Sequence, residues 1–64
     1  MNVYIVKLLI SYEGFIIEGV FETYEEAIKK AFEVKKDHEG YYDIQVLQFN
    51  TITQKTEVYN VWPT

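Results

Sequence analysis

The residues that could do chemistry in this 64-residue sequence are few, and the first of them is His38, the only histidine. With Asp37 and Glu39 beside it, His38 could act as a general base or join its neighbours as a metal ligand. Consecutive residues at a helix end point in different directions, however, and the chain has no second histidine and no cysteine. We therefore interpret His38 as a cation near a helix C-terminus, where the helix dipole favours positive charge.

Carboxylates are the next candidates, because paired acidic side chains can carry out general acid–base catalysis when they oppose each other across a cleft. Glu22, Glu25 and Glu26 are close in sequence, but capping and compensation of a helix dipole account for all three. Ser11 is the only serine and has no nucleophile motif around it, and the three glycines are too dispersed for a phosphate loop. The sequence predicts no catalytic residue, no metal site and no cofactor, so we expect a protein that is not an enzyme.

The charge and composition of the chain limit its partners. The formal net charge is -4 at pH 7, and arginine is absent. Nucleic-acid binders need clustered Lys and Arg, so we expect no nucleic-acid partner. The longest apolar run is far shorter than a membrane span, and the lack of cysteine gives no sign of an oxidising compartment. We therefore expect a cytoplasmic protein without a membrane partner.

The element that would position the acidic residues is a helix, predicted over residues 24–38. Thr23 and Glu26 have the spacing of a capping box, in which the Thr23 hydroxyl accepts the Glu26 N–H and the Glu26 carboxylate accepts the Thr23 N–H. Gly40 suits the left-handed position that follows a helix. Apolar residues recur at the spacing of one helical face. They are Tyr24, Ala27, Ile28, Ala31 and Phe32.

Strands are predicted on both sides of this helix, over residues 3–11, 15–21, 41–50 and 56–62. The first is apolar on both faces, which is typical of a central strand that is covered on both sides. Strict alternation places four residues of the second strand on one face, namely Phe15, Ile17, Gly19 and Phe21. A glycine inside a strand also indicates a bulge or the close approach of another backbone, and Gly19 is such a glycine.

The predicted architecture is a single α+β domain over residues 1–64, in the order ββαββ. A spatial strand order 2-1-3-4 makes the four-stranded sheet wholly antiparallel, places the doubly apolar strand inside and lets the helix cross one face. One helix covers only one face, so the other face would expose more contiguous apolar surface than an isolated monomer tolerates. We therefore expect a homodimer, joined sheet face to sheet face or edge to edge.

Aromatic residues are the strongest sign of a binding surface, since the chain holds six Tyr, four Phe and one Trp. Such side chains are enriched at protein interfaces, although in a small domain many of them pack in the core. The candidates for contacts with a protein partner or a second copy lie on the two late strands: Tyr41, Tyr42, Phe49, Tyr59 and Trp62. Stacking of single-stranded nucleic acid on them is disfavoured by the acidic charge and the missing arginine.

Short motifs in the chain resemble a known pattern. In chain order they are VYIV at 3–6, GVF at 19–21, a threonine cap at 23 and EEA at 25–27. This arrangement resembles a group of small uncharacterised ββαββ proteins of phages and bacteria. The resemblance covers most of the chain but does not extend to the connection at 50–56. In size and acidity the chain also resembles phage-encoded inhibitors of bacterial immunity, such as the small anti-Hachiman proteins. The resemblance implies a phage protein that acts in the cytoplasm of a bacterial host and has no catalytic residues.

Three functions remain open on this basis. The first is a non-enzymatic homodimeric inhibitor that binds and blocks a bacterial defence protein. The second is a small-ligand sensing or sequestering module with a pocket at the dimer interface, lined by Tyr and Trp, since ligand pockets are mostly apolar with few polar groups. The third is an enzyme, for which His38 is the candidate base.

Overall fold

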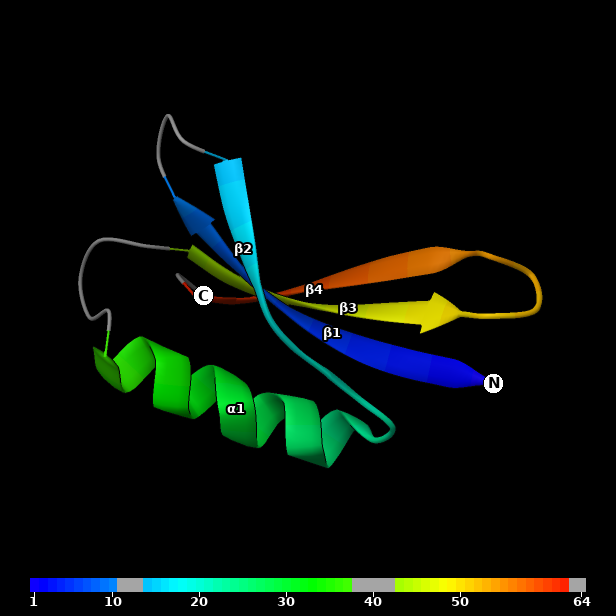
Figure 1. Ribbon diagram of the computed structural model, residues 1–64, viewed down its shortest axis with the longest axis horizontal. Helices are drawn as coiled ribbons and strands as arrows, with labels where there is room; N and C mark the ends of the chain where they lie inside the picture. The colour runs from blue at the N-terminus through cyan, green and yellow to red at the C-terminus, as the bar shows by residue number, and fades with distance from the viewer. Residues whose placement is uncertain (11–13, 38–42, 63–64) are drawn as a thin grey trace.

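Four strands and one helix follow one another in the order ββαββ in the computed structural model, which describes residues 1–10, 14–37 and 43–62 apart from the side chains of Asn60 and Trp62. The elements are β1 (Asn2–Ile10), β2 (Gly14–Phe21), α1 (Tyr24–Asp37), β3 (Asp43–Asn50) and β4 (Thr56–Trp62), drawn in Figure 1. Every predicted element is present. The predicted last residue of the helix, 38, and the predicted first residues of the third strand, 41 and 42, lie outside the described residues.

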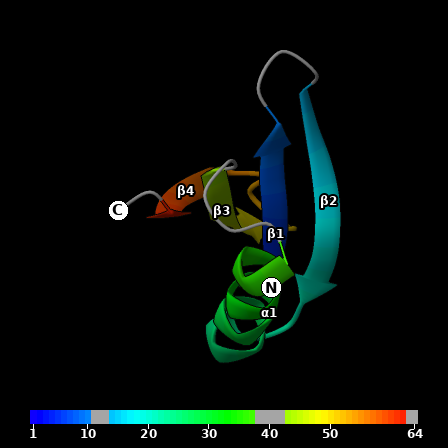
Figure 2. The same cartoon turned by 90° about the vertical axis from the view of Figure 1, so that its left-hand side faces the viewer.

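The strands form one antiparallel sheet in the order β2-β1-β3-β4, as predicted. The strand with two apolar faces, β1, lies inside the sheet between β2 and β3, and the helix covers one of its two faces. The helix packs against β1, β2 and β3. Figure 2, in which α1 is seen nearly end-on, shows it on one side of a strongly twisted sheet. The predicted α+β fold, with one helix on one face, is confirmed.

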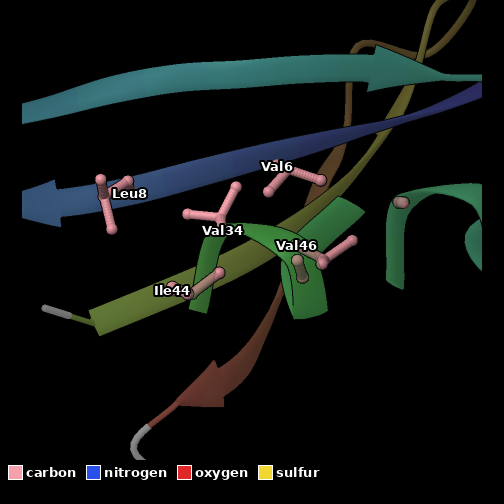
Figure 3. Packing of buried hydrophobic residues seen from close by; sticks show 7 residues of the cluster. Val6, Leu8, Val34, Ile44 and Val46 are labelled. Carbon is pink, nitrogen blue, oxygen red and sulfur yellow. The ribbon is translucent and has the colours of Figure 1, made fainter. Parts of the chain in front are cut away.

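A small core fills the space between α1 and the sheet. Its fully buried side chains come from β1, β3 and the helix: Val6, Leu8, Ala27, Ala31, Val34, Ile44 and Val46. Figure 3 shows the larger of them pointing toward one another. Two alanines on the helix let its backbone come close to the sheet. The helical face differs from the predicted one at two positions, because Val34 is buried, although it was not in the predicted set, and Phe32 is 58% exposed.

A β-bulge in β2 changes which residues share a face. Val6 pairs with Gly19 and Lys7 pairs with Ile17, so Glu18 is an extra residue without a partner on β1. The side-chain alternation therefore shifts by one on the two sides of Glu18. Phe15 and Ile17 lie on the face turned away from the helix, and the prediction that they share a face with Gly19 is wrong. The predicted irregularity near Gly19 is present.

Gly19 also has a packing role on the helix side of β2. A Cβ atom at Gly19 would lie 2.7 Å from two atoms of the Phe21 ring. The ring therefore occupies the space that a side chain at Gly19 would fill. Phe21 in turn packs against the core, so this glycine allows an aromatic side chain to close the outer edge of the core next to β2.

The helix begins at the predicted cap. The Thr23 hydroxyl oxygen accepts a hydrogen bond from the Glu26 N–H at 3.3 Å, as the capping box predicts. The Glu26 carboxylate accepts the Thr23 hydroxyl at 2.9 Å, where the prediction had the Thr23 N–H as the donor. Glu25 and Glu26 occupy the first turn and Lys35 and Lys36 the last, so the charges complement the helix dipole.

The connection between β3 and β4 is held by local hydrogen bonds. The Asn50 side-chain oxygen accepts the N–H groups of Ile52 and Thr53 at 2.9 and 3.0 Å. Both the N–H and the hydroxyl of Thr51 donate to the Met1 carbonyl, at 2.8 and 3.0 Å. These contacts fasten the start of β1 to the β3–β4 hairpin, which reaches beyond the first turn of α1 in Figure 1.

The overall dimensions are those of a small domain. The radius of gyration is 11.4 Å, against about 10.7 Å for a typical domain of this length. In the described part of the chain, no helix combines the length and the apolar character that crossing a bilayer requires.

Candidate binding surfaces

The largest candidate surface is the side of the sheet that α1 does not cover, here called the open face. Residues on it alternate along the strands with the buried core residues and pair with one another across the sheet. Its apolar members are Val3, Ile5, Leu9, Phe15, Ile17, Val20, Leu47, Phe49 and Val58. Phe15 is 55% exposed, Val20 58% and Val58 51%. The surplus apolar face expected from the sequence is therefore present.

The order of pairing makes the apolar residues of the open face contiguous. Ile5 lies between Val20 on β2 and Leu47 on β3. Leu47 is in turn paired with Val58 on β4, and Val3 is paired with Phe49. Apolar side chains thus run from one edge of the sheet to the other, which is the arrangement that marks a protein–protein contact when it stays uncovered.

Charge on the open face is sparse. Lys7 lies among these apolar residues, with its ammonium nitrogen 4.0 Å from the centroid of the Phe15 ring. An ammonium group over a ring face is favourable, and the aliphatic stem of a lysine also covers apolar surface. Asp43 pairs with Leu9 near the end of β3. The face is therefore poorer in charge than an ordinary protein surface, as the centre of a protein interface is.

The second candidate surface lies on the helix side of the sheet, where the sheet extends past the first turn of α1. A hollow of about 260 Å³ is lined there by Tyr4, Tyr24, Gln48 and Tyr59, and we call it the tyrosine hollow. The rings of Tyr4 and Tyr24 meet edge to face, with centroids 6.0 Å apart and planes at 72°. Tyr24 and Tyr59 meet at 5.9 Å and 71°. Three elements, β1, α1 and β4, thus each supply one ring.

Polar groups lie beside these rings. The Tyr59 hydroxyl is 2.9 Å from a carboxylate oxygen of Glu57 and 3.2 Å from the side-chain oxygen of Gln48. The hydrogen bond to Glu57 raises the pKa of Tyr59 above its ordinary value, and desolvation and the negative charge of Glu57 act in the same direction. A carboxylate that accepts this hydrogen bond keeps the phenol neutral and the site negatively charged.

A smaller polar hollow adjoins the tyrosine hollow. It has a volume of about 170 Å³ and shares Gln48 with the first one. Its other lining residues are Asn2, Asn50, Thr53, Lys55 and Glu57. The side-chain oxygen of Asn2 is buried and has no hydrogen-bond partner among the described residues. Aromatic and polar surfaces therefore meet at Gln48 and Glu57.

The residues predicted as interface candidates do not form one surface. Phe49 lies on the open face and Tyr59 in the tyrosine hollow, on opposite sides of the sheet. Tyr41 and Tyr42 lie outside the described residues, as does the side chain of Trp62. Tyr4, Tyr24 and Gln48 were missed by the sequence reasoning. The signal for two of them was present, because the predicted strand order brings Tyr4 of β1 opposite Gln48 of β3.

The catalytic and metal-binding alternatives gain nothing from the structure. His38 and Ser11 lie outside the described residues. Within the described part of the chain, no cluster of His, Cys, Asp or Glu side chains could hold a metal ion. Of the acidic residues considered, Glu26 belongs to the helix cap, and Glu22 and Glu25 are exposed.

Comparison with known proteins gives one match. Residues 1–59 match the family model of DUF7336, a domain of unknown function. The matched range contains every residue of the open face and of the tyrosine hollow. No match is found among curated proteins or among solved structures. Since the family model covers nearly the whole chain, this protein belongs to the DUF7336 family.

Proposed function

We propose that this protein is a non-enzymatic binding domain that works as a homodimer, joined through the open face. The observation that carries the proposal is the contiguous apolar surface from β2 to β4. Four strands about 4.8 Å apart and eight residues long give a face of roughly 19 by 26 Å. That footprint is roughly 500 Å², which puts a contact through this face at the small end of specific interfaces, whose standard size is about 800 Å² per partner.

A second copy of the chain fits this face better than an occasional partner does. The core holds few residues, and domains of this size commonly need oligomerisation to reach ordinary stability. A transient partner would leave the apolar face exposed to water whenever it dissociates. A second copy of the chain is present wherever the protein is made and can cover the face permanently. Permanent interfaces are also the more hydrophobic ones, which agrees with a face whose described residues near the centre are apolar apart from Lys7, itself packed over the Phe15 ring.

The dimer in turn binds another protein through its outer surface. The target class is a bacterial defence protein, which the dimer blocks in the cytoplasm of the bacterial host. Support for this target class comes from the resemblance in size and acidity to phage-encoded inhibitors of bacterial immunity. The VYIV, GVF and EEA motifs resemble uncharacterised phage and bacterial proteins and do not bear on the target. Inhibition by occupancy needs no catalytic group, so the proposal requires no chemistry from His38.

The dimer is tested by light scattering coupled to size exclusion over a concentration series. Leu47→Lys places a charge at the middle of the open face, between Ile5 and Val58. Ile52→Lys adds the same charge at the hairpin, where Ile52 is 80% exposed, and serves as the matched control. We expect the natural protein and Ile52→Lys to be dimers and Leu47→Lys to be a folded monomer by circular dichroism. A monomeric natural protein at every concentration would refute the dimer.

The target class is tested separately in cells. The chain is produced in bacteria that carry the Hachiman defence system, and phage plating is compared with and without it. We expect the natural protein and Ile52→Lys to restore plating and Leu47→Lys not to do so. Plating that stays low with a protein shown to be a dimer would remove the Hachiman system as the target and leave the dimer standing.

A second candidate function, a small-ligand module, is favoured by the tyrosine hollow. The hollow differs from the predicted ligand pocket, because Tyr4, Tyr24 and Tyr59 of one chain line it without a second copy. Its position on the helix side also leaves it accessible when the open face is covered.

A further inference from the structure

We propose that the tyrosine hollow binds an organic cation, specifically a methylated ammonium group. The site consists of the rings of Tyr4, Tyr24 and Tyr59 with the oxygens of Gln48 and Glu57 beside them. This proposal is independent of the homodimer, since the hollow and the open face lie on opposite sides of the sheet.

The arrangement of the rings suits a compact cation. The ring plane of Tyr24 makes angles of 72° with that of Tyr4 and 71° with that of Tyr59, so the rings meet edge to face and are not stacked. A stack of parallel rings would leave no space between them, whereas rings at these angles border an open hollow on the surface. The hollow of about 260 Å³ has room for several waters of about 30 Å³ each, and hence for a small alkylammonium group. Ring faces attract cations through their quadrupole, which is the physical basis of aromatic cages for methylated ammonium ligands.

The charge around the hollow favours a cation over an anion or a neutral ligand. Glu57 lies at hydrogen-bond distance from the Tyr59 hydroxyl. Among the described residues, no lysine lines the tyrosine hollow, and Lys55 lines only the adjoining polar hollow. The pKa of Tyr59 is raised chiefly by its hydrogen bond to Glu57 and by desolvation, and the negative charge of Glu57 adds to the shift. The formal net charge of -4 adds a long-range attraction for cations.

The hydrogen bonding explains why a methylated cation fits better than a plain ammonium. A lysine-type ammonium is strongly hydrated and carries three donors that need acceptors when water is removed. The Glu57 carboxylate, 2.9 Å away, already accepts the single proton of the Tyr59 hydroxyl, and the Gln48 side-chain oxygen lies 3.2 Å from the same hydroxyl. A trimethylammonium group has no N–H and presents methyl groups to the ring faces, so it leaves this hydrogen-bond arrangement intact.

The adjoining polar hollow suits the remainder of such a ligand. Its lining includes Asn2, whose side-chain oxygen is buried and lacks a hydrogen-bond partner in the described structure. A hydroxyl or amide N–H attached to the methylated ammonium would supply the missing donor. Choline has the first of these groups, and a peptide that carries trimethyllysine has the second.

The test is a titration of the natural protein with choline and with a peptide that carries one trimethyllysine, followed by nuclear magnetic resonance of the tyrosine ring protons. The matched control ligand is the uncharged tert-butyl analogue of choline, which has the same shape without the charge. We expect the cations to shift the ring signals of Tyr4, Tyr24 and Tyr59 and the neutral analogue not to do so. The ligand that saturates at the lower concentration identifies the source, a free metabolite or a modified protein.

Three variants complete the test. Tyr24→Leu removes the middle ring at a side chain that is 41% exposed, so the fold should persist. Glu57→Gln removes the charge, and Phe49→Leu removes a ring on the open face as the control. We expect loss of binding with Tyr24→Leu, about fivefold weaker binding with Glu57→Gln, and no change with Phe49→Leu. Absence of binding, equal binding of the neutral analogue, or unchanged binding by Tyr24→Leu would each overturn the proposal.

Discussion

On the helix side of the sheet, Val6, Leu8, Ile44 and Val46 are at most 1% exposed, whereas on the open face Phe15, Val20 and Val58 are more than half exposed. The buried residues lie on the inner strands β1 and β3, and the exposed ones lie on the edge strands β2 and β4. On the inner strands the open-face side chains, such as Ile5, Leu9 and Leu47, are half-buried and so still more exposed than their neighbours on the helix side. The difference comes from α1, which brings Ala27, Ala31 and Val34 against one face only. An apolar strand face thus becomes a core only where a second layer covers it, and the uncovered one is available for binding.

The sharpest way to test this contrast uses two neighbouring leucines of β1. Leu8 is buried under the helix, and Leu9 lies on the open face. We expect Leu8→Ala to lower the free energy of unfolding by about 2–5 kcal/mol, because it leaves a cavity in the core. Leu9→Ala should cost about half as much or less in a monomer, since its side chain keeps contact with water. Urea denaturation of the two variants measures both values.

Protein concentration extends this comparison to the dimer. If a second copy covers the open face, the cost of Leu9→Ala rises with protein concentration, while the cost of Leu8→Ala changes little. Equal costs for the two variants at low concentration would mean that the two faces do not differ as described.

A smaller effect is expected at the edge of the covered face. Gly19→Ala would place a methyl group 2.7 Å from the Phe21 ring, so the ring has to move out of its place beside the core. We expect a loss of about 1–3 kcal/mol in the free energy of unfolding. Phe21→Ala removes the clash, so the double variant should lose less than the sum of the two single losses. Additive losses would show that the ring and the glycine do not share this space.

The helix that covers this side of the sheet is stabilised by its N-terminal cap. Thr23→Ala removes the hydroxyl that accepts the Glu26 N–H, and we expect it to cost about 1 kcal/mol. Thr23→Ser keeps the hydroxyl and is the control. Thermal unfolding followed by circular dichroism measures the loss, and a Thr23→Ala variant as stable as the natural protein would show that the cap contributes nothing.

The smallest effect is expected in the tyrosine hollow, on the part of the helix side that α1 does not cover. The pKa of Tyr59 is raised by its hydrogen bond to Glu57, so Glu57→Gln should lower this pKa toward the ordinary value of about 10. Because the folded pKa lies above the unfolded one, the stability from this group is present below about pH 10 and is lost as the pH rises through the folded pKa. Spectrophotometric titration of the phenolates measures the shift, with Glu33→Gln as the remote control. A Tyr59 pKa unchanged by Glu57→Gln would refute the assigned cause.

Much of the fold could be predicted from local patterns. The cap at Thr23 and the alternating strands determine the elements, and the apolar character of both faces of β1 places that strand inside the sheet. Together with the chain direction, this leaves few strand orders, and 2-1-3-4 was among them. The buried face of the helix was harder to predict. Phe32 and Val34 lie at its two borders, and only packing against the sheet decides which of them is buried.

The candidate sites were less predictable for a physical reason. One unpaired residue, Glu18, reverses the facing of Phe15 and Ile17, and no local pattern around Glu18 determines the register. The tyrosine hollow combines residues of β1, α1, β3 and β4. It therefore depends on where the helix begins, at Tyr24, relative to the β3–β4 hairpin. Composition showed that aromatic residues were abundant, but it could not assign Phe49 and Tyr59 to opposite sides of the sheet.

The bulge at Glu18 also affects how the molecule can aggregate. β2 is an edge strand, rich in aliphatic and aromatic residues, and its outer backbone could act as a template for strands of other molecules. The extra residue interrupts the regular spacing of hydrogen-bonding groups in the middle of this edge. A foreign strand could therefore match only half of β2 at a time. Growth into fibrils along this edge is discouraged by one inserted, charged residue.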